Sequence, residues 1–211
     1  MFLRWRLAQF FEIRWWQRYF AGRDTQTYLD WKRAYWRDFL DKSGIELKPG
    51  AFVLDAGCGP AGIFMILDDF RVDAVDPLLD RYEQKLPHFQ RADYPNVRFF
   101  NEPLETFNRE NQYDAVFCLN AINHVADLDL SLDHLAALTK PGGTLAVSID
   151  AHNYQWVKKL FRLFPGDVLH PHQYDLEEYK EMLRKRGGRV VREVLVKREG
   201  VFSYWLLVLR S

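Results

Sequence analysis

Short apolar runs alternate with helical patterns along the chain beyond residue 50. The apolar runs are AFVLDAG (51–57), RVDAVDP (71–77), NVRFFNE (96–102), YDAVFCLN (113–120) and GTLAVSID (143–150). Between them, AGIFMILDDF, LLDRYEQKL and SLDHLAALTK have the pattern of helices. Strands that alternate with helices indicate crossover connections, so we predict an α/β fold with a mainly parallel sheet.

In the C-terminal part the pattern changes. YDLEEYKEMLRKRGG predicts a helix capped by Asp175, with Glu178 three residues later and Gly187 and Gly188 at its end. RVVREVLVKREG and VFSYWLLVLR predict two strands that turn at Gly200 and pair antiparallel. We therefore expect an open sheet that ends in an antiparallel edge.

Two helices are predicted in residues 1–45, which we treat as a segment separate from residues 46–211. The second helix carries a stripe of large apolar side chains and ends at Gly44. In the first, three tryptophans fall on one half, interrupted by Gln9 and Glu12, whereas four arginines share the other half with leucine and phenylalanine. A helix that lies in a membrane interface separates its apolar and basic side chains more cleanly, so membrane contact is only the reserve interpretation.

Composition and charge narrow the class of protein. The chain has 211 residues, of which 48% are hydrophobic and 27% charged, and its net charge is zero. A dedicated nucleic-acid binder is usually basic, so no nucleic-acid partner is expected. The two cysteines, Cys58 and Cys118, suggest reduced buried thiols. Together with the lack of a signal peptide pattern or a long apolar run, they predict a cytoplasmic protein.

The strongest chemical signal is VLDAGCGPAGIF, which places G-x-G-x-x-G between a predicted strand and a predicted helix. Gly57, Gly59 and Gly62 permit a tight turn and a close approach of a ligand to the backbone. Asp76 ends the next strand about 20 residues on, where a carboxylate can bind ribose hydroxyls. A turn cap before Pro77 is the plainer alternative for Asp76. Taken this far, the pattern fits an NAD-dependent oxidoreductase.

Asp55, two residues before the first glycine, argues against a dinucleotide. Its carboxylate would face the pyrophosphate, and like charges at short range in a partly dry cleft repel each other strongly. A ligand that has an ammonium and a sulfonium group but no phosphate is favoured instead. S-adenosylmethionine (SAM) is such a ligand.

With these motifs the chain resembles the class I SAM-dependent methyltransferases, a broad group that includes ubiquinone and menaquinone biosynthesis enzymes. The resemblance covers residues 46–211 and rests on VLDAGCGPAGIF, VDAVDPL, YDAVFCLNAINHV and ALTKPGGTLAVSI in this order. It implies a Rossmann-like seven-stranded sheet in the order 3-2-1-4-5-7-6, with strand 7 antiparallel. It also implies that the segment before the first strand is a helical lid over the ligands.

The resemblance assigns the cofactor side of the site residue by residue. Asp55 and Gly57 match positions near the methionine part of SAM, and Gly59 matches the loop beneath the ribose. Asp76 matches the acid that takes both ribose hydroxyls, and Pro77 flanks the adenine.

Two further assignments concern the reacting atoms and the adenine amino group. Asn120 matches the end of strand 4, beside the sulfonium. For the contact with the adenine amino group, FFNEPLETF offers three candidates: Asn101, Glu102 and Glu105. We favour Glu102 for this contact. The equal alternative is that Glu102 is only a solvated acid in a loop.

Methyl transfer from a sulfonium is an in-line displacement, so the protein must position the nucleophile and exclude water. A general base is needed only when the acceptor loses a proton. His124, after strand 4, is our candidate for this catalytic role, and packing on the following helix is the alternative. The candidates for contact with the acceptor are Tyr28, Trp31, Tyr35, His170 and His172. No metal site is predicted, because no carboxylate or cysteine completes a ligand set around the histidines.

We therefore predict a SAM-dependent methyltransferase that acts on a small aromatic or lipophilic acceptor. One alternative is an NAD-dependent oxidoreductase, which Asp55 and the antiparallel edge disfavour. Another is a SAM-binding or membrane-associated protein without activity. A protein or nucleic-acid methyltransferase is a third, although residues 120–123 lack the Asn/Asp-Pro-Pro-Tyr motif of enzymes that methylate nucleic-acid amino groups.

Overall fold

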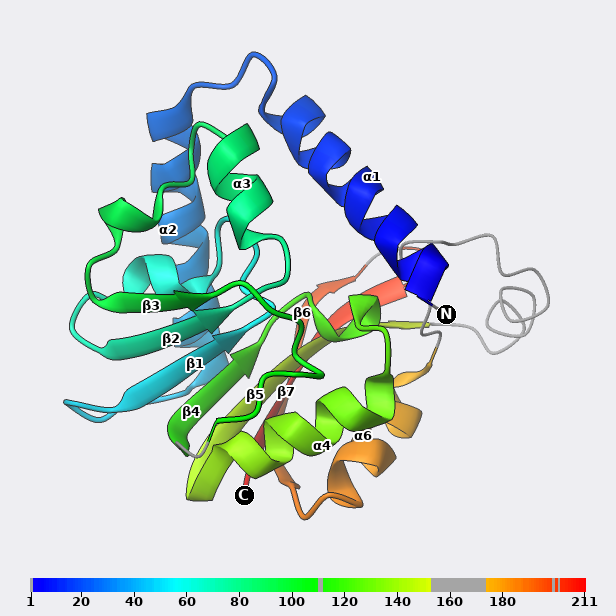
Figure 1. The fold of residues 1–211 in the computed structure, drawn as a ribbon. Coiled ribbons are helices and arrows are strands. Elements are labelled where there is room, and N and C mark those ends of the chain that lie inside the picture. The colour runs from blue at the N-terminus through cyan, green and yellow to red at the C-terminus, as the bar shows by residue number, and fades with distance from the viewer. Residues whose placement is uncertain (1, 110–111, 153–173, 199, 201) are drawn as a thin grey trace.

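A seven-stranded sheet forms the centre of the computed structural model (Figure 1). The structure describes residues 2–109, 112–152, 174–198, 200 and 202–211. The strands are β1 (Phe52–Ala56), β2 (Arg71–Val75), β3 (Val97–Phe100), β4 (Tyr113–Cys118), β5 (Thr139–His152), β6 (Arg189–Arg198) and β7 (Phe202–Arg210). β1 to β5 are parallel, and β7 pairs antiparallel with β5 and β6. The order β3-β2-β1-β4-β5-β7-β6 confirms the predicted fold class and strand order.

Five α-helices are described. They are α1 (Phe2–Phe20), α2 (Thr25–Ser43), α3 (Leu79–Lys85), α4 (Leu128–Leu138) and α6 (Leu176–Arg184). Capping residues mark ends of α2, α4 and α6. Gly44 ends α2 in the left-handed conformation, with φ of 64°. Asp175 and Glu178 form a reciprocal capping box at the start of α6, as the sequence predicts.

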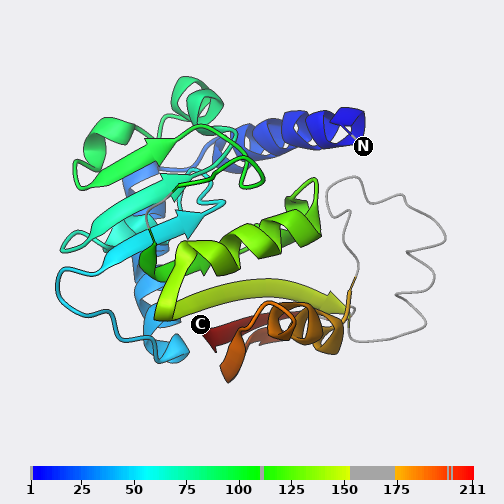
Figure 2. The same cartoon turned by 60° about the horizontal axis from the view of Figure 1, so that its bottom comes forward.

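Helices cover both faces of the sheet (Figure 2). The alternation of side chains along each strand divides the core into two layers, one on each face. Val53 belongs to the core layer that includes side chains of α1, α2 and α3. Its neighbour Leu54 belongs to the layer that includes side chains of α4 and α6. Because the central strands are buried on both faces, their sequences are nearly continuous apolar runs.

The prediction of an α-helix in AGIFMILDDF is wrong. The structure has only a short 3-10 helix there, at Ile63–Ile66. Ile63, Phe64 and Met65 are all buried, so the segment lacks the polar face of a surface helix. The carboxylate of Asp55 also accepts a hydrogen bond from the Phe64 N–H, at 3.0 Å.

The N-terminal helices pack on the sheet region as part of its core. Ile13 of α1 and Phe39 of α2 lie in the same apolar cluster as Val53 of β1. The Trp36 indole donates a 2.9 Å hydrogen bond to the carbonyl of Ala61, which joins α2 to the glycine loop. The division of the chain at residue 45 stays a prediction. No described helix is long and apolar enough to cross a bilayer.

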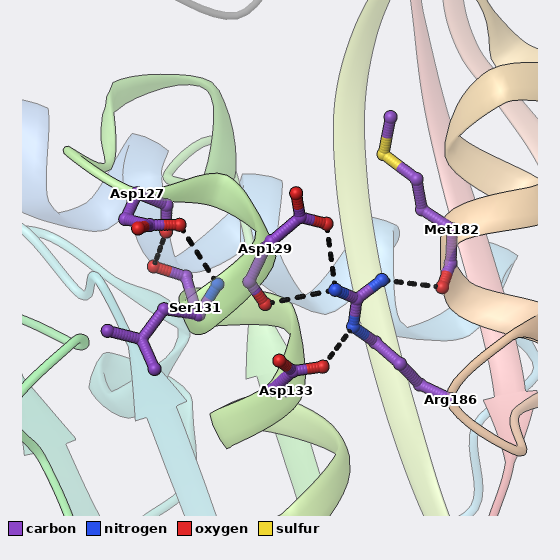
Figure 3. Close-up of polar contacts among 7 residues, drawn as sticks. Asp127, Asp129, Ser131, Asp133, Met182 and Arg186 are labelled. Atoms are coloured by element: carbon purple, nitrogen blue, oxygen red, sulfur yellow. Dashed lines mark hydrogen bonds and ion pairs between the residues drawn. The ribbon is translucent and has the colours of Figure 1, made fainter.

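Arg186, just after α6, ties the C-terminal part to α4 (Figure 3). Its guanidinium donates to Asp133 at 2.5 Å, to the Asp129 carboxylate at 2.8 Å and to the Met182 carbonyl at 2.9 Å. Asp127 caps the same end of α4 by accepting from the Leu130 N–H. These bonds anchor α4, which follows the loop after β4.

Candidate functional site

A cavity of about 510 Å³ lies at the carboxyl ends of β1, β2 and β4, bordered by α1 and α2. The order of the strands reverses between β1 and β4, where ligands of open α/β sheets bind. The sheet side of the cavity is lined by residues 57–61, 75–78, 103–105, 119–121, 124 and 125. The two helices contribute Gln9, Glu12, Trp15, Trp16, Tyr19, Tyr28, Trp31, Lys32, Tyr35 and Trp36.

The glycine loop after β1 needs its glycines for close packing. Gly57 has φ of 70° and donates from its N–H to the carbonyl of Val75 at 2.8 Å. A Cβ atom there would lie 2.3 Å from the Cβ of Ala121. At Gly62 a Cβ would lie 2.3 Å from a carboxylate oxygen of Asp55. Side chains at these positions would push apart the loop and the strand ends that border the cavity.

Asp76 sits at the end of β2, with its carboxylate oriented by the backbone. One oxygen accepts from the Leu78 N–H at 2.8 Å and the other from the Gly59 N–H at 3.0 Å. Burial raises the pKa of this carboxyl, and the nearby charge of Glu12 raises it further. The glycine loop and Asp76 therefore form one hydrogen-bonded unit in the cavity wall.

Glu12 of α1, for which the sequence predicted no role, reaches the same end of the cavity. The Tyr82 hydroxyl of α3 donates a 2.6 Å hydrogen bond to its carboxylate. Burial raises the pKa of Glu12, while the hydrogen bonds from Tyr82 and Trp16 lower it. One signal was available in the sequence: Glu12 is the only acid among the first 23 residues.

Lys32 of α2, for which the sequence also predicted no role, contributes a cation to the cavity lining. Its ammonium lies 4.5 Å from the ring centre of Trp36 and 4.6 Å from that of Tyr35. Burial lowers the pKa of Lys32 to about 8, although the charge of Asp55 opposes this shift.

Asp55 lies beneath the glycine loop, outside the residues that line the cavity. Burial raises the pKa of its carboxyl to about 7, against the lowering effect of N–H groups of Phe64 and Ile63 and of the Lys32 ammonium. Asp55 therefore acts on the cavity through the loop it orients and through its charge.

The end of the cavity beyond β4 contains Asn120 and His124. Asn120 has φ of 59°, the one positive value among the described residues other than glycine. Its N–H donates to the Ser148 hydroxyl at 2.7 Å, and that hydroxyl lies 2.7 Å from the Tyr204 hydroxyl. These contacts hold the strained residue at the cavity wall. His124 lines the same end from a short 3-10 helix at Ile122–His124.

Most of the predicted site residues meet in this cavity. Its lining includes Gly57, Gly59, Asp76, Pro77, Asn120, His124, Tyr28, Trp31 and Tyr35. Their individual roles stay predictions. His170 and His172 lie outside the residues that the structure describes.

Glu102 lies apart from the lining, and its carboxylate pairs with Arg109 at 2.6 Å. Glu105, the competing acid, does line the cavity. One of its oxygens accepts from the N–H groups of Ala126 at 2.6 Å and Asp127 at 3.1 Å. The position of the cavity therefore favours Glu105 over Glu102 for contact with a ligand.

The two cysteines are buried and contribute packing. Burial raises the pKa of both thiols, so they stay protonated, whereas a nucleophilic cysteine needs a lowered pKa. Among the described residues, no group of three or more histidine, cysteine or acidic side chains could hold a metal ion.

Solved structures with this fold include methyltransferases. The N-methyltransferase NodS from Bradyrhizobium japonicum, in complex with S-adenosylhomocysteine, superimposes with a TM-score of 0.67 at 15% identity, covering 97% of this chain and 98% of that one. The 1,6-didemethyltoxoflavin N1-methyltransferase from Burkholderia thailandensis, with its namesake compound and S-adenosylhomocysteine bound, has a TM-score of 0.59 at 21% identity. That match covers 92% of this chain and 83% of the other.

Sequence comparisons agree with the structural ones. The ubiquinone biosynthesis O-methyltransferase of Nitrobacter winogradskyi is 30% identical over 111 residues, which are 50% of this chain and 41% of the relative. The pavine N-methyltransferase of Thalictrum flavum is 25% identical over 134 residues, which are 62% of this chain and 37% of the relative. The chain thus spans less than half the length of these relatives. The family model described as a methyltransferase domain matches residues 28–193, more than half of the chain. The chain therefore belongs to the methyltransferase-domain family.

Proposed function

We propose that the protein binds SAM in this cavity and transfers the methyl group to a small aromatic or lipophilic acceptor. The observation that carries the proposal is that the glycine loop, Asp76 and Lys32 face one cavity beneath aromatic side chains of α1 and α2. Family membership supports methyl transfer. The S-adenosylhomocysteine bound to two proteins of the same fold supports SAM as the cofactor.

Asp76 is suited to hold the ribose of the cofactor. Each of its oxygens already accepts one backbone hydrogen bond, and each keeps a lone pair for a hydroxyl donor. Because the backbone bonds fix the carboxylate, little orientation is lost on binding. Pro77, next in the chain, lines the cavity and offers an apolar surface to the adenine.

Lys32 is suited to hold the carboxylate of the methionine part. It is the only lysine or arginine in the described cavity lining, where it is surrounded by aromatic rings. Asp55, behind the loop, adds negative charge that favours a cationic ligand. A dinucleotide pyrophosphate would instead meet the acids Asp76, Glu12 and Glu105, which argues against the NAD-dependent alternative.

SAM supplies an electrophilic methyl group on a sulfonium, so the chain has to align the acceptor and exclude water. The rings of Tyr28, Trp31 and Tyr35 line the cavity and offer flat surfaces to an aromatic acceptor. Aromatic faces also attract a cationic ligand. His124 lines the cavity near Asn120 and is our candidate base for an acceptor that loses a proton.

The test is to incubate the protein with a small-molecule cell extract and isotopically labelled SAM, and to read by mass spectrometry which compound gains the label. We expect a low-molecular-weight aromatic or lipophilic compound to be labelled. With SAM below saturation, the labelling should fall by about tenfold or more in Asp76→Asn. It should be retained in Asp69→Asn, which removes an exposed acid before β2. Binding of SAM without any labelled product, across extracts of varied origin, would support the alternative of a SAM-binding protein without activity.

A further inference from the structure

The helix α1 has two faces of different chemistry. Ile13 and Phe20 are buried, Trp16 is half-buried, and all three pack in the core. Residues 10, 11, 14, 15 and 18 are exposed on the other side, and each has a neighbour three or four positions away in the set, so they share one side of the helix. We call these residues (Phe10, Phe11, Arg14, Trp15 and Arg18) the outer face of α1.

Three large aromatic side chains are exposed on the outer face. Phe10 and Phe11 are each 47% exposed and Trp15 is 52% exposed. The two phenylalanine rings contact each other edge to face, with centres 5.7 Å apart. Neighbouring exposed aromatic side chains on a folded protein indicate a surface that another molecule covers.

The charge of the outer face is wholly positive. Arg14 and Arg18 lie between the aromatic side chains, and the Arg14 guanidinium is 5.5 Å from the ring centre of Phe10. Glu12, the only acid of α1, points the other way and is bonded to Tyr82. The first eight residues add Arg4 and Arg6 to the sequence and no acid.

We propose that the outer face of α1 docks on an anionic lipid surface. Arginines interleaved with phenylalanine and tryptophan suit this partner, because guanidinium groups pair with lipid phosphates while the rings enter the headgroup region. A nucleic acid would need a longer basic groove, and two arginines beside an acid-lined cavity do not supply one.

The structure also removes the objection to membrane contact raised by the helical wheel. Gln9 and Glu12 interrupt the wheel, but both line the cavity and neither belongs to the outer face. The wheel looked mixed because α1 has two apolar sides, one packed on the core and one exposed. On the outer side, the exposed residues from Phe10 to Arg18 are aromatic or basic except for Gln17 at the edge, which carries no charge.

Trp15 connects the proposed lipid surface with the cavity. It is half-exposed on the outer face and also lines the cavity. A docked α1 would hold the cavity mouth near the lipid, from which a lipophilic acceptor could enter. This last point rests on the proposed function, whereas lipid docking itself does not.

The experiment is co-sedimentation of the full chain with vesicles of phosphatidylcholine alone and of phosphatidylcholine mixed with phosphatidylglycerol. We expect binding to the mixed vesicles, a decrease with added salt, and little binding to phosphatidylcholine alone. In the double variant Arg14→Glu/Arg18→Glu, binding should fall by at least about tenfold, because each basic residue near an anionic surface contributes severalfold. Phe10→Ser/Phe11→Ser should weaken binding as well.

The matched control is Arg184→Glu/Lys185→Glu, which makes the same change of charge at the end of α6, on the opposite side of the molecule from α1 (Figures 1 and 2). It should bind like the unaltered protein. SAM affinity and melting temperature, measured for each variant, show whether α1 is still folded, and Arg14→Gln/Arg18→Gln replaces any variant that is not. Absence of binding to the mixed vesicles, equal loss in the control, or preferential binding of RNA or DNA by the outer face would each overturn the proposal.

Discussion

The Tyr82 hydroxyl donates a 2.6 Å hydrogen bond to the Glu12 carboxylate, and this bond joins α1 to α3 beside the cavity. The two residues are 70 positions apart in the chain. Both groups are buried, so the Glu12 carboxylate depends on its hydrogen bonds from Tyr82 and Trp16 and loses one of them when the Tyr82 hydroxyl is removed.

Replacing Tyr82 with phenylalanine is therefore expected to loosen α1. The variant should lose about 1 kcal/mol of stability, the usual net contribution of one hydrogen bond, because Glu12 keeps its bond from Trp16. It should also bind SAM more weakly, because α1 borders the cavity. Amide hydrogen exchange in residues 9–20 should become faster.

Tyr113→Phe is the matched control for this prediction. Tyr113 donates a 2.7 Å hydrogen bond from its hydroxyl to Asp73, away from the cavity. It should lower stability by a similar amount without changing SAM affinity. Equal SAM affinity in both variants would contradict a role of α1 in holding the cofactor.

SAM affinity is expected to depend on pH in both directions. Below about pH 7, Asp55 takes up a proton and removes a charge that favours a cationic ligand. Above about pH 8, Lys32 loses the charge proposed to hold the methionine carboxylate. Calorimetric titrations should therefore give the tightest binding between these values. In Lys32→Arg the loss above pH 8 should disappear, and a flat profile in the unaltered protein would argue against both roles.

The free energy of unfolding of the cofactor-free protein should depend on whether Asp55 is protonated. Burial raises the pKa of this carboxyl to about 7 from its ordinary value of 3.8, so the folded state holds the proton more tightly than the unfolded state. This contribution is fully present below the ordinary pKa and is lost as the pH rises through about 7. Asp55→Asn should therefore be more stable than the unaltered protein at pH 8, by about 2–4 kcal/mol.

The measurement is chemical denaturation of both proteins at several pH values. The difference between them should shrink as the pH falls toward the ordinary pKa of aspartate. A variant that is less stable at every pH would show that the hydrogen bond to Phe64 outweighs the burial of charge.

The titration of His88 should change the stability of the protein with pH in the direction opposite to that of Asp55. Its ring is buried, stacks on Phe20 with centres 3.4 Å apart, and has no hydrogen-bond partner for either nitrogen among the described residues. Burial lowers its pKa to about 4 from 6.5, so its contribution to stability is present above 6.5 and is lost as the pH falls through about 4. His88→Leu should be more stable by about 1 kcal/mol at neutral pH. Thermal melts should show that the variant tolerates acid better; equal acid sensitivity would contradict this assignment.

Local chemistry explains which parts of the site the sequence predicted. Gly57, Gly59 and Asp76 belong to one strand–loop–strand unit, and their spacing follows from the turn itself. The alternation of strands and helices likewise predicted the sheet order once the family resemblance was included. The α-helix wrongly predicted in AGIFMILDDF, where the structure has only a 3-10 helix at Ile63–Ile66, shows the limit of such patterns, because a fully buried apolar run has no periodicity to read.

Glu12 and Lys32 could not be predicted by spacing. They reach the cavity only because α1 and α2 dock against the sheet region, and no local rule relates residue 12 to residue 76. For the same reason the wheel of α1 could not separate the packed side from the exposed side. Glu102 and Glu105 likewise differ by which of them the fold turns toward the cavity.

The central claim is that this cavity binds SAM through Asp76, and calorimetric titration tests it most directly. We expect SAM to bind the unaltered protein and Asp69→Asn with equal affinity, and NADH not to bind. Asp76→Asn should weaken SAM binding by about tenfold or more, since hydrogen bonds to a charged group are worth about 1.5–3 kcal/mol. SAM affinity that is the same in Asp76→Asn and the unaltered protein, or tight NADH binding, would contradict the account.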